Sequence, residues 1–94
     1  MSEKEGNMGS QEFLNICKAK IAAYFNEHRE KTDTVDITVN DVYVVWYCKT
    51  LQNHKALLST TATDGMYYEM TFNGDMNELY MDAYKKWQYI GFDM

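Results

Sequence analysis

Alternating apolar and polar positions dominate the middle of the chain, between Asp41 and Phe72. This stretch holds three runs rich in β-branched and aromatic residues, separated by two short polar segments. Such runs bounded by polar turns are typical of strands. They predict strands at Val42–Thr50, Lys55–Ala62 and Met66–Phe72, joined as a three-stranded antiparallel meander.

The segment before the meander has a helical spacing of apolar residues, with Ser10 as a plausible N-cap. The stripe consists of Phe13, Cys17, Ile21, Tyr24 and His28. It indicates an amphipathic helix with one buried face, ending near the basic residues Arg29–Lys31. For the next segment we favour a cap and one helical turn at Thr38–Asp41 over a short edge strand at Val35–Val39.

The segment after the meander also shows helical spacing. Asp75-Met76-Asn77-Glu78 has the form of a capping box. The apolar stripe that follows consists of Met76, Leu79, Tyr80, Ala83, Tyr84, Trp87 and Ile90. We therefore expect a second helix over Met76–Gln88, with Asp82 and Lys86 paired on its wet side. The predicted fold is α+β, with the order α-β-β-β-α and two helices packed on the three-stranded meander.

The length of 94 residues fits one domain with a single core. We expect a flexible N-terminal tail over residues 1–9, a single α+β domain over residues 10–90 and a C-terminal tail over residues 91–94. The polar leader lacks the apolar segment of a signal peptide. No apolar run approaches the roughly 20 residues of a membrane span.

The dipeptide Asp64-Gly65 predicts a two-residue type I′ turn, which would place Thr61 opposite Tyr68 and Ser59 opposite Met70. Extended across the sheet, this register defines two faces. The face expected to form the helix-packed core carries Tyr43, Val45, Tyr47, Leu57, Tyr68, Met70 and Phe72. The second face carries Val44, Trp46, Cys48, Leu58, Thr60, Tyr67 and Glu69.

The second face is too apolar along its first strand to be left in water. Either one helix covers each face of the sheet, or the surplus face meets a protein partner. A partner contact would be centred on Trp46 and Tyr67 and flanked by Val44 and Leu58. Trp and Tyr are typical anchors of protein interfaces.

Charge and cysteine content narrow the function classes. The net charge of −5 argues against binding to phosphate backbones and favours a basic protein partner. The two cysteines, Cys17 and Cys48, lack zinc-ligand spacing and fit free, mostly buried thiols in a reducing cytoplasm.

No catalytic constellation is present in the sequence. His28 fits a histidine at the edge of the core, and His54 fits a solvated turn residue. The acidic residues Asp33, Asp36 and Asp41 match no calcium-loop pattern. We therefore expect a protein without enzymatic activity, without a cofactor and without a metal site.

The order α-β-β-β-α resembles that of double-stranded-RNA-binding domains, which present a basic cluster at the start of their second helix. Here that position is the acidic segment Asp75–Glu78, so binding to double-stranded RNA is not expected. The alternative to protein binding is nucleic-acid or nucleotide binding by base stacking on the sheet. Its candidate residues are Tyr43, Trp46, Tyr47, Lys49 and Lys55.

Three segments carry a family resemblance: VVWYCKTLQNHKALLSTT at Val44–Thr61, DGMYYE at Asp64–Glu69 and DAYKKW at Asp82–Trp87. They resemble a family of small uncharacterised proteins from phages and prophages of Gram-positive bacteria. The likeness spans about Gln11–Trp87 and leaves Tyr89–Met94 outside it. It implies an accessory protein in the cytoplasm of a bacterial host, with no assigned activity. The predicted function is protein–protein interaction, either self-association or binding of a host factor.

Overall fold

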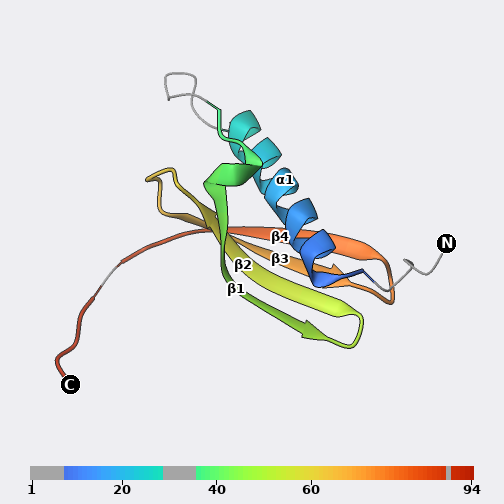
Figure 1. Ribbon diagram of the computed structural model, residues 1–94. Coiled ribbons are helices and arrows are strands. Elements are labelled where there is room, and N and C mark those ends of the chain that lie inside the picture. The colour runs from blue at the N-terminus through green and yellow to red at the C-terminus, as the bar shows by residue number, and fades with distance from the viewer. Residues whose placement is uncertain (1–7, 29–35, 89) are drawn as a thin grey trace.

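The computed structural model describes residues 8–28, 36–88 and 90–94. Its elements are the helix α1 (Ser10–His28), the 3₁₀ helix η2 (Val39–Asp41) and the strands β1 (Val42–Thr50), β2 (Asn53–Thr60), β3 (Met66–Asn73) and β4 (Glu78–Lys85). The strands form one antiparallel sheet in the order β1-β2-β3-β4. Helix α1 lies across one face of this sheet (Figure 1). The α+β class is confirmed, but the sheet has four strands rather than three.

The predicted second helix is wrong, because its segment forms β4. This strand pairs with the whole of β3, from Asn73 opposite Glu78 to Met66 opposite Lys85. Pairing satisfies the backbone groups along the outer edge of β3, which a helix would have left exposed.

The residues of β4 fit a strand as well as a helix. Leu79, Met81 and Ala83 alternate with Tyr80, Asp82 and Tyr84. In the strand, Leu79 and Met81 pack against the core. The expected pairing of Asp82 with Lys86 on a helix surface is lost with the helix.

The supposed capping box is a turn between β3 and β4. The Asn73 side chain accepts hydrogen bonds from the backbone N–H groups of Asp75 and Met76, at 3.0 and 3.2 Å. Asn77 has a φ of +55°, a left-handed conformation that Asn tolerates better than most residues. The polar side chains that would cap a helix therefore close a hairpin loop instead.

The loop between β2 and β3 is longer than predicted. Ser59 pairs with Tyr67 and Leu58 with Tyr68, so the two-residue register at Asp64-Gly65 is wrong. Asp64 nevertheless helps to close the loop, since its carboxylate accepts a hydrogen bond from the N–H of Met66 at 3.1 Å. Compared with the prediction, β3 is shifted by three residues along β2. Because three is an odd number, residues of β2 and β3 that were predicted to share a face lie on opposite faces of the sheet.

A bulge in β1 also changes which residues share a face. Val44 pairs with Leu58 and Trp46 with Leu57, so Val45 is an extra residue between two consecutive pairs. Strand β1 therefore presents Val44 and Tyr47, rather than Val45 and Tyr47, on the same side of the sheet.

The core lies between α1 and one face of the sheet, termed here the helix face. Its buried apolar residues are Phe13, Cys17, Ile21, Ala22, Val42, Ala56, Leu58, Tyr68, Met70 and Phe72. The buried stripe of α1 is confirmed at Phe13, Cys17 and Ile21, and burial raises the pKa of the Cys17 thiol to about 12.

His28 is exposed and stacks on Tyr24, with ring centroids 4.0 Å apart. The predicted end of the helix at Arg29–Lys31 lies outside the described residues, as does most of the loop after it.

The predicted helical turn before the sheet is confirmed. Thr38 caps η2, and its side chain accepts a hydrogen bond from the N–H of Asn40 while the Asp41 carboxylate accepts one from the N–H of Thr38. The Asn26 side chain of α1 bonds the backbone N–H and C=O of Ile37 at 2.8 and 2.9 Å. These contacts fix the entry of β1 against the helix.

His54 is not a solvated turn residue, because β2 places it in the core with 1% of its surface exposed. Its Nδ1 accepts a hydrogen bond from the Tyr47 hydroxyl at 2.6 Å, and its Nε2 donates to the carbonyl oxygen of Met8 at 2.9 Å. The ring also stacks on Phe13, with centroids 4.8 Å apart. The turn between β1 and β2 is instead formed by Leu51 and Gln52.

Two hairpin turns meet at one end of the sheet. A Cβ added to Gly74 would lie 2.2 Å from the carbonyl oxygen of Gln52, so only glycine permits this approach. The N–H of Gly74 donates to the Asn53 side chain at 2.8 Å, and the Gln52 side chain donates to Asp75. The β1–β2 turn is thereby attached to the β3–β4 turn.

Candidate functional site: the uncovered face of the sheet

The second face of the sheet has no helix over it in the described part of the chain (Figure 1). We call it the uncovered face. Following the strand pairing, its apolar and aromatic residues are Tyr43, Trp46, Leu57, Tyr67, Tyr80 and Tyr84. Its charged residues are Lys55, Glu69, Glu78 and Asp82.

Aromatic side chains on this face are substantially exposed. Trp46 has 42% of its surface exposed and Tyr43 has 48%, although both belong to the hydrogen-bonded strand β1. Tyr67 is half-buried between its neighbours. Pairing aligns Tyr43, Ser59, Tyr67 and Tyr84 across all four strands, which places three tyrosines in one row. Such a surface offers large rigid contact groups that lose little conformational entropy on binding.

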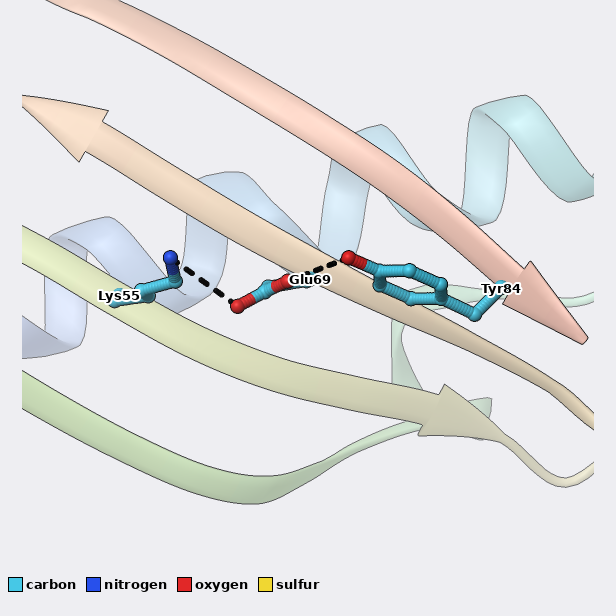
Figure 2. Close-up of polar contacts among 3 residues, drawn as sticks. All are labelled: Lys55, Glu69 and Tyr84. Atoms are coloured by element: carbon cyan, nitrogen blue, oxygen red, sulfur yellow. Dashed lines mark hydrogen bonds and ion pairs between the residues drawn. The ribbon is translucent and has the colours of Figure 1, made fainter. Parts of the chain in front are cut away.

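A polar row crosses the middle of the face. Glu69 accepts a hydrogen bond from the Tyr84 hydroxyl at 2.9 Å and forms an ion pair with Lys55 at 3.2 Å. The three residues come from β3, β4 and β2, and Figure 2 shows them side by side with α1 behind the strands. These two contacts restrict the side-chain conformations of residues that a partner would contact.

Hydrogen bonds on the uncovered face shift the pKa values of three of its residues. The hydrogen bond from Tyr84, followed by that from Lys55, holds the pKa of Glu69 below its usual value. The same bond raises the pKa of the Tyr84 hydroxyl, and a hydrogen bond to Glu78 raises that of Tyr80. At neutral pH these shifts keep Glu69 a carboxylate and keep Tyr80 and Tyr84 neutral phenols.

One pairing on this face is electrostatically unfavourable. Glu69 and Asp82 lie directly opposite each other on β3 and β4. Like charges at opposed positions destabilise an antiparallel pair. Lys55 offsets part of this repulsion through Glu69, while Asp82 remains exposed at the edge of the face.

The structure divides the four residues predicted to contact a partner. Trp46 and Tyr67 share the uncovered face. Val44 and Leu58 pair with each other on the helix face, where Leu58 is completely buried. The prediction of a single face that holds all four is therefore wrong, and two of them are available at the uncovered face.

Tyr80 and Tyr84 join this face, although the sequence pattern had not predicted either as a site residue, because their segment was expected to form a helix. A strand signal was present, since Tyr80, Asp82 and Tyr84 alternate with three apolar residues. Cys48 also differs from expectation, because it is exposed rather than buried, although both cysteines are free.

No cluster of three or more His, Cys, Asp or Glu residues that could hold a metal ion occurs among the described residues. Both nitrogens of His54 are engaged inside the core. Within the same residues, every buried side-chain nitrogen or oxygen has a hydrogen-bond partner.

Comparison with known proteins places the chain in a family. The model of DUF6275, a family of unknown function, matches residues 14–94. The chain belongs to this family. The DUF6275 match includes α1 from Leu14 onward, the whole sheet and the C-terminal residues that the earlier resemblance left out. No curated protein and no solved structure matches the chain significantly.

In the ranges that the structure describes, no helix of this DUF6275 protein is both long enough and apolar enough to cross a membrane.

Proposed function

We propose that this chain is a small non-enzymatic accessory protein of a phage or prophage, which acts in the cytoplasm of a bacterial host by binding another protein. The observation that carries the proposal is the uncovered face, where Trp46 and a row of tyrosines lie outside the core. Exposed aromatic patches of this kind are typical of protein interfaces.

The charges of the face favour a partner with basic residues around an apolar contact. A Lys or Arg of the partner placed between Glu69 and Asp82 would offset the repulsion between these carboxylates. Packing of two identical uncovered faces would instead bring two such carboxylate pairs together. We therefore assign the face to a different protein, a host factor, rather than to a second copy.

The test is capture from a bacterial lysate with the full chain immobilised. Trp46→Ala removes the central anchor, and Leu51→Ala is the matched control, because Leu51 is exposed in the β1–β2 turn away from the face. We expect a partner that the wild type and the control retain and that Trp46→Ala retains roughly tenfold less or weaker. Equal retention by Trp46→Ala and the wild type would refute the proposal.

Self-association through the face is tested separately with Trp87→Phe, in which Trp46 is the remaining tryptophan. We expect the Trp46 emission maximum to stay constant on dilution, because the proposed partner is another protein. Emission that shifts to the red on dilution, together with a falling mass in light scattering, would assign the face to a second copy.

Nucleic-acid binding is the alternative function, favoured by the exposed rings of Tyr43 and Trp46 and by Lys55 on the same face. Two observations weigh against it. Tyr47 donates to His54 from the helix face and is not available for stacking. The carboxylates of Glu69 and Asp82 would repel phosphates. We expect no mobility shift of single-stranded DNA or RNA at low salt, and a shift abolished by Trp46→Ala would support the alternative.

A further inference from the structure

The described residues after β4 form an exposed extension, called here the C-terminal arm (residues 87–88 and 90–94). The N–H of Lys86 still donates to the carbonyl oxygen of Gly65 at 2.8 Å. Beyond it the chain runs away from the sheet (Figure 1). Trp87 is 92% exposed and Phe92 is 81% exposed. Two large aromatic groups on one short arm are costly to leave in water.

The arm has the pattern of a strand with one apolar side. Ile90, Phe92 and Met94 occur at every second position and are all exposed. In an extended chain, residues at this spacing point to the same side. The DUF6275 match reaches residue 94, so the family model covers the arm.

A groove of about 410 Å³ lies between α1 and β4. It exists because α1 packs mainly over β1 and β2 and leaves the helix face of β4 partly open. Its apolar lining comes from Ala23 and Tyr24 of α1 and from Met70, Leu79 and Met81 of the sheet. Methionine side chains adapt readily to an aromatic group, with favourable sulfur–ring contacts.

Strand β4 is also the last strand of the sheet, so no described strand pairs with its outer edge. Its outward N–H and C=O groups can pair with an added strand. The groove and this edge lie side by side, because Leu79 and Met81 belong to both. An extended segment with one apolar side would satisfy the edge and fill the groove together.

We propose that the C-terminal arm of a second copy adds to the outer edge of β4 and inserts Phe92, flanked by Ile90 and Met94, into the groove. The exchange is reciprocal, so that each copy gives one arm and receives one. Of the two charged residues of α1 that line the groove, Lys20 and Glu27, Lys20 supplies the cation for Asp93 of the incoming arm. The protein is thus an arm-exchanged homodimer.

A second copy fits the groove better than the chain's own arm. Leu79 and Met81 lie in the first half of β4, whereas the arm leaves after Lys85 at its other end. The arm of the same chain would have to fold back along β4 to reach them, but its described residues run away from the sheet and leave Phe92 81% exposed. An arm from another copy reaches them without any reversal.

The surface available is sufficient for a stable dimer. On each arm Phe92 buries roughly 150–250 Å² when covered, and Ile90 and Met94 add to this area. Counting both arms and the surfaces that receive them, the exchange would bury on the order of 1,200–2,000 Å², the range of stable interfaces.

The test measures the mass of the full chain by light scattering over a concentration series. On the arm, Phe92→Ala is compared with Gln88→Ala, which changes an exposed polar residue of the same segment. On the groove, Ala23→Arg is compared with Ala19→Arg, because both alanines are exposed on α1 and Ala23 alone lines the groove. We expect the wild type and both controls to be dimers, and Phe92→Ala and Ala23→Arg to dissociate roughly tenfold more readily or worse.

Mixing the two weakened variants tests whether the arm of one copy binds in the groove of another. Phe92→Ala keeps an intact groove, and Ala23→Arg keeps an intact arm, so the mixture can form one complete contact and should recover part of the dimer. A wild-type monomer, or a mixture without recovery, would refute the exchange. Circular dichroism of each variant shows whether it has folded.

The exchange uses a surface other than the uncovered face, so the two proposals fail separately. Trp46→Ala should leave the dimer intact, and Phe92→Ala should still retain the host factor. A dimer that is abolished by Trp46→Ala and insensitive to Phe92→Ala would refute the arm exchange and assign self-association to the uncovered face.

Discussion

The two faces of this sheet contain similar kinds of residues but meet different surroundings. On the helix face, Leu58 and Met70 are buried beneath α1. On the uncovered face, their chain neighbours Leu57 and Glu69 are only half-buried. One step along a strand thus separates a residue that holds the fold together from one available to a partner. Composition alone does not reveal this division, because tyrosines occur on both faces.

The largest expected difference comes from two adjacent leucines. Leu58→Ala should lower the free energy of unfolding by about 2–5 kcal/mol, because it leaves a cavity between α1 and the sheet. Leu57→Ala on the uncovered face should cost less than about 1 kcal/mol. Urea unfolding of both variants measures the difference. Equal losses would mean that the uncovered face is as tightly packed as the core.

A smaller difference is expected from two tyrosines of β1. Tyr47→Phe removes the hydroxyl that donates to buried His54 and should cost about 1–2 kcal/mol. Tyr43→Phe, at an exposed position, should change stability by less than about 0.5 kcal/mol. The pair is compared by thermal and urea unfolding. A cost at Tyr43 as large as that at Tyr47 would show that the uncovered face depends on its own polar contacts.

The helix face should also give the fold a pH dependence near neutrality. Burial lowers the pKa of His54 below its ordinary value of 6.5 in the folded state. The unfolded chain then binds more protons, so this contribution is complete above pH 6.5 and is lost as the pH falls toward the folded pKa. Unfolding between pH 7.5 and 5.5 should show stability decreasing with acidity in the wild type. The decrease should be smaller in His54→Gln, and an identical slope in both proteins would contradict the assignment.

The smallest effect concerns Asp82 on the uncovered face. Asp82→Asn removes the like charge opposite Glu69 and should raise stability by a few tenths of a kcal/mol. The same variant should bind a basic partner more weakly and with less dependence on salt. A stability gain combined with weaker binding would show that the uncovered face retains a repulsion that serves recognition. Loss of stability in Asp82→Asn would remove that interpretation.

The sequence predicted the parts of the fold that depend on local signals. Strand β1 was placed correctly at Val42–Thr50, and Thr38 capped the helical turn as expected. The stripe of α1 identified Phe13, Cys17 and Ile21 because a 3.6-residue period has few competing interpretations over several turns.

The errors arose where two periods fit the same residues. Tyr80 and Tyr84 are four apart, which suits one side of a helix and equally one side of a strand. The choice was decided by the open edge of β3, a tertiary feature that no local pattern contains. This error removed two tyrosines from the candidate site and concealed the edge of β4.

The assignment of faces failed for a different reason. Alternation identifies the residues on one side of a strand only while the strand stays regular and the loop lengths are known. The bulge at Val45 and the longer β2–β3 loop broke both conditions. Trp46 and Tyr67 were still placed together, whereas Leu58 was assigned to the wrong side of the sheet.

The bulge at Val45 has a consequence for the evolution of this family. Val44 and Trp46 pair with Leu58 and Leu57, which are themselves consecutive, so removal of Val45 would leave every other residue of β1 opposite its present partner. The length of β1 can therefore vary by one residue here, and the remaining residues keep their places on the helix face or the uncovered face. We expect an alignment of DUF6275 sequences to show a single-residue gap at this position, in members whose β1 is a regular strand.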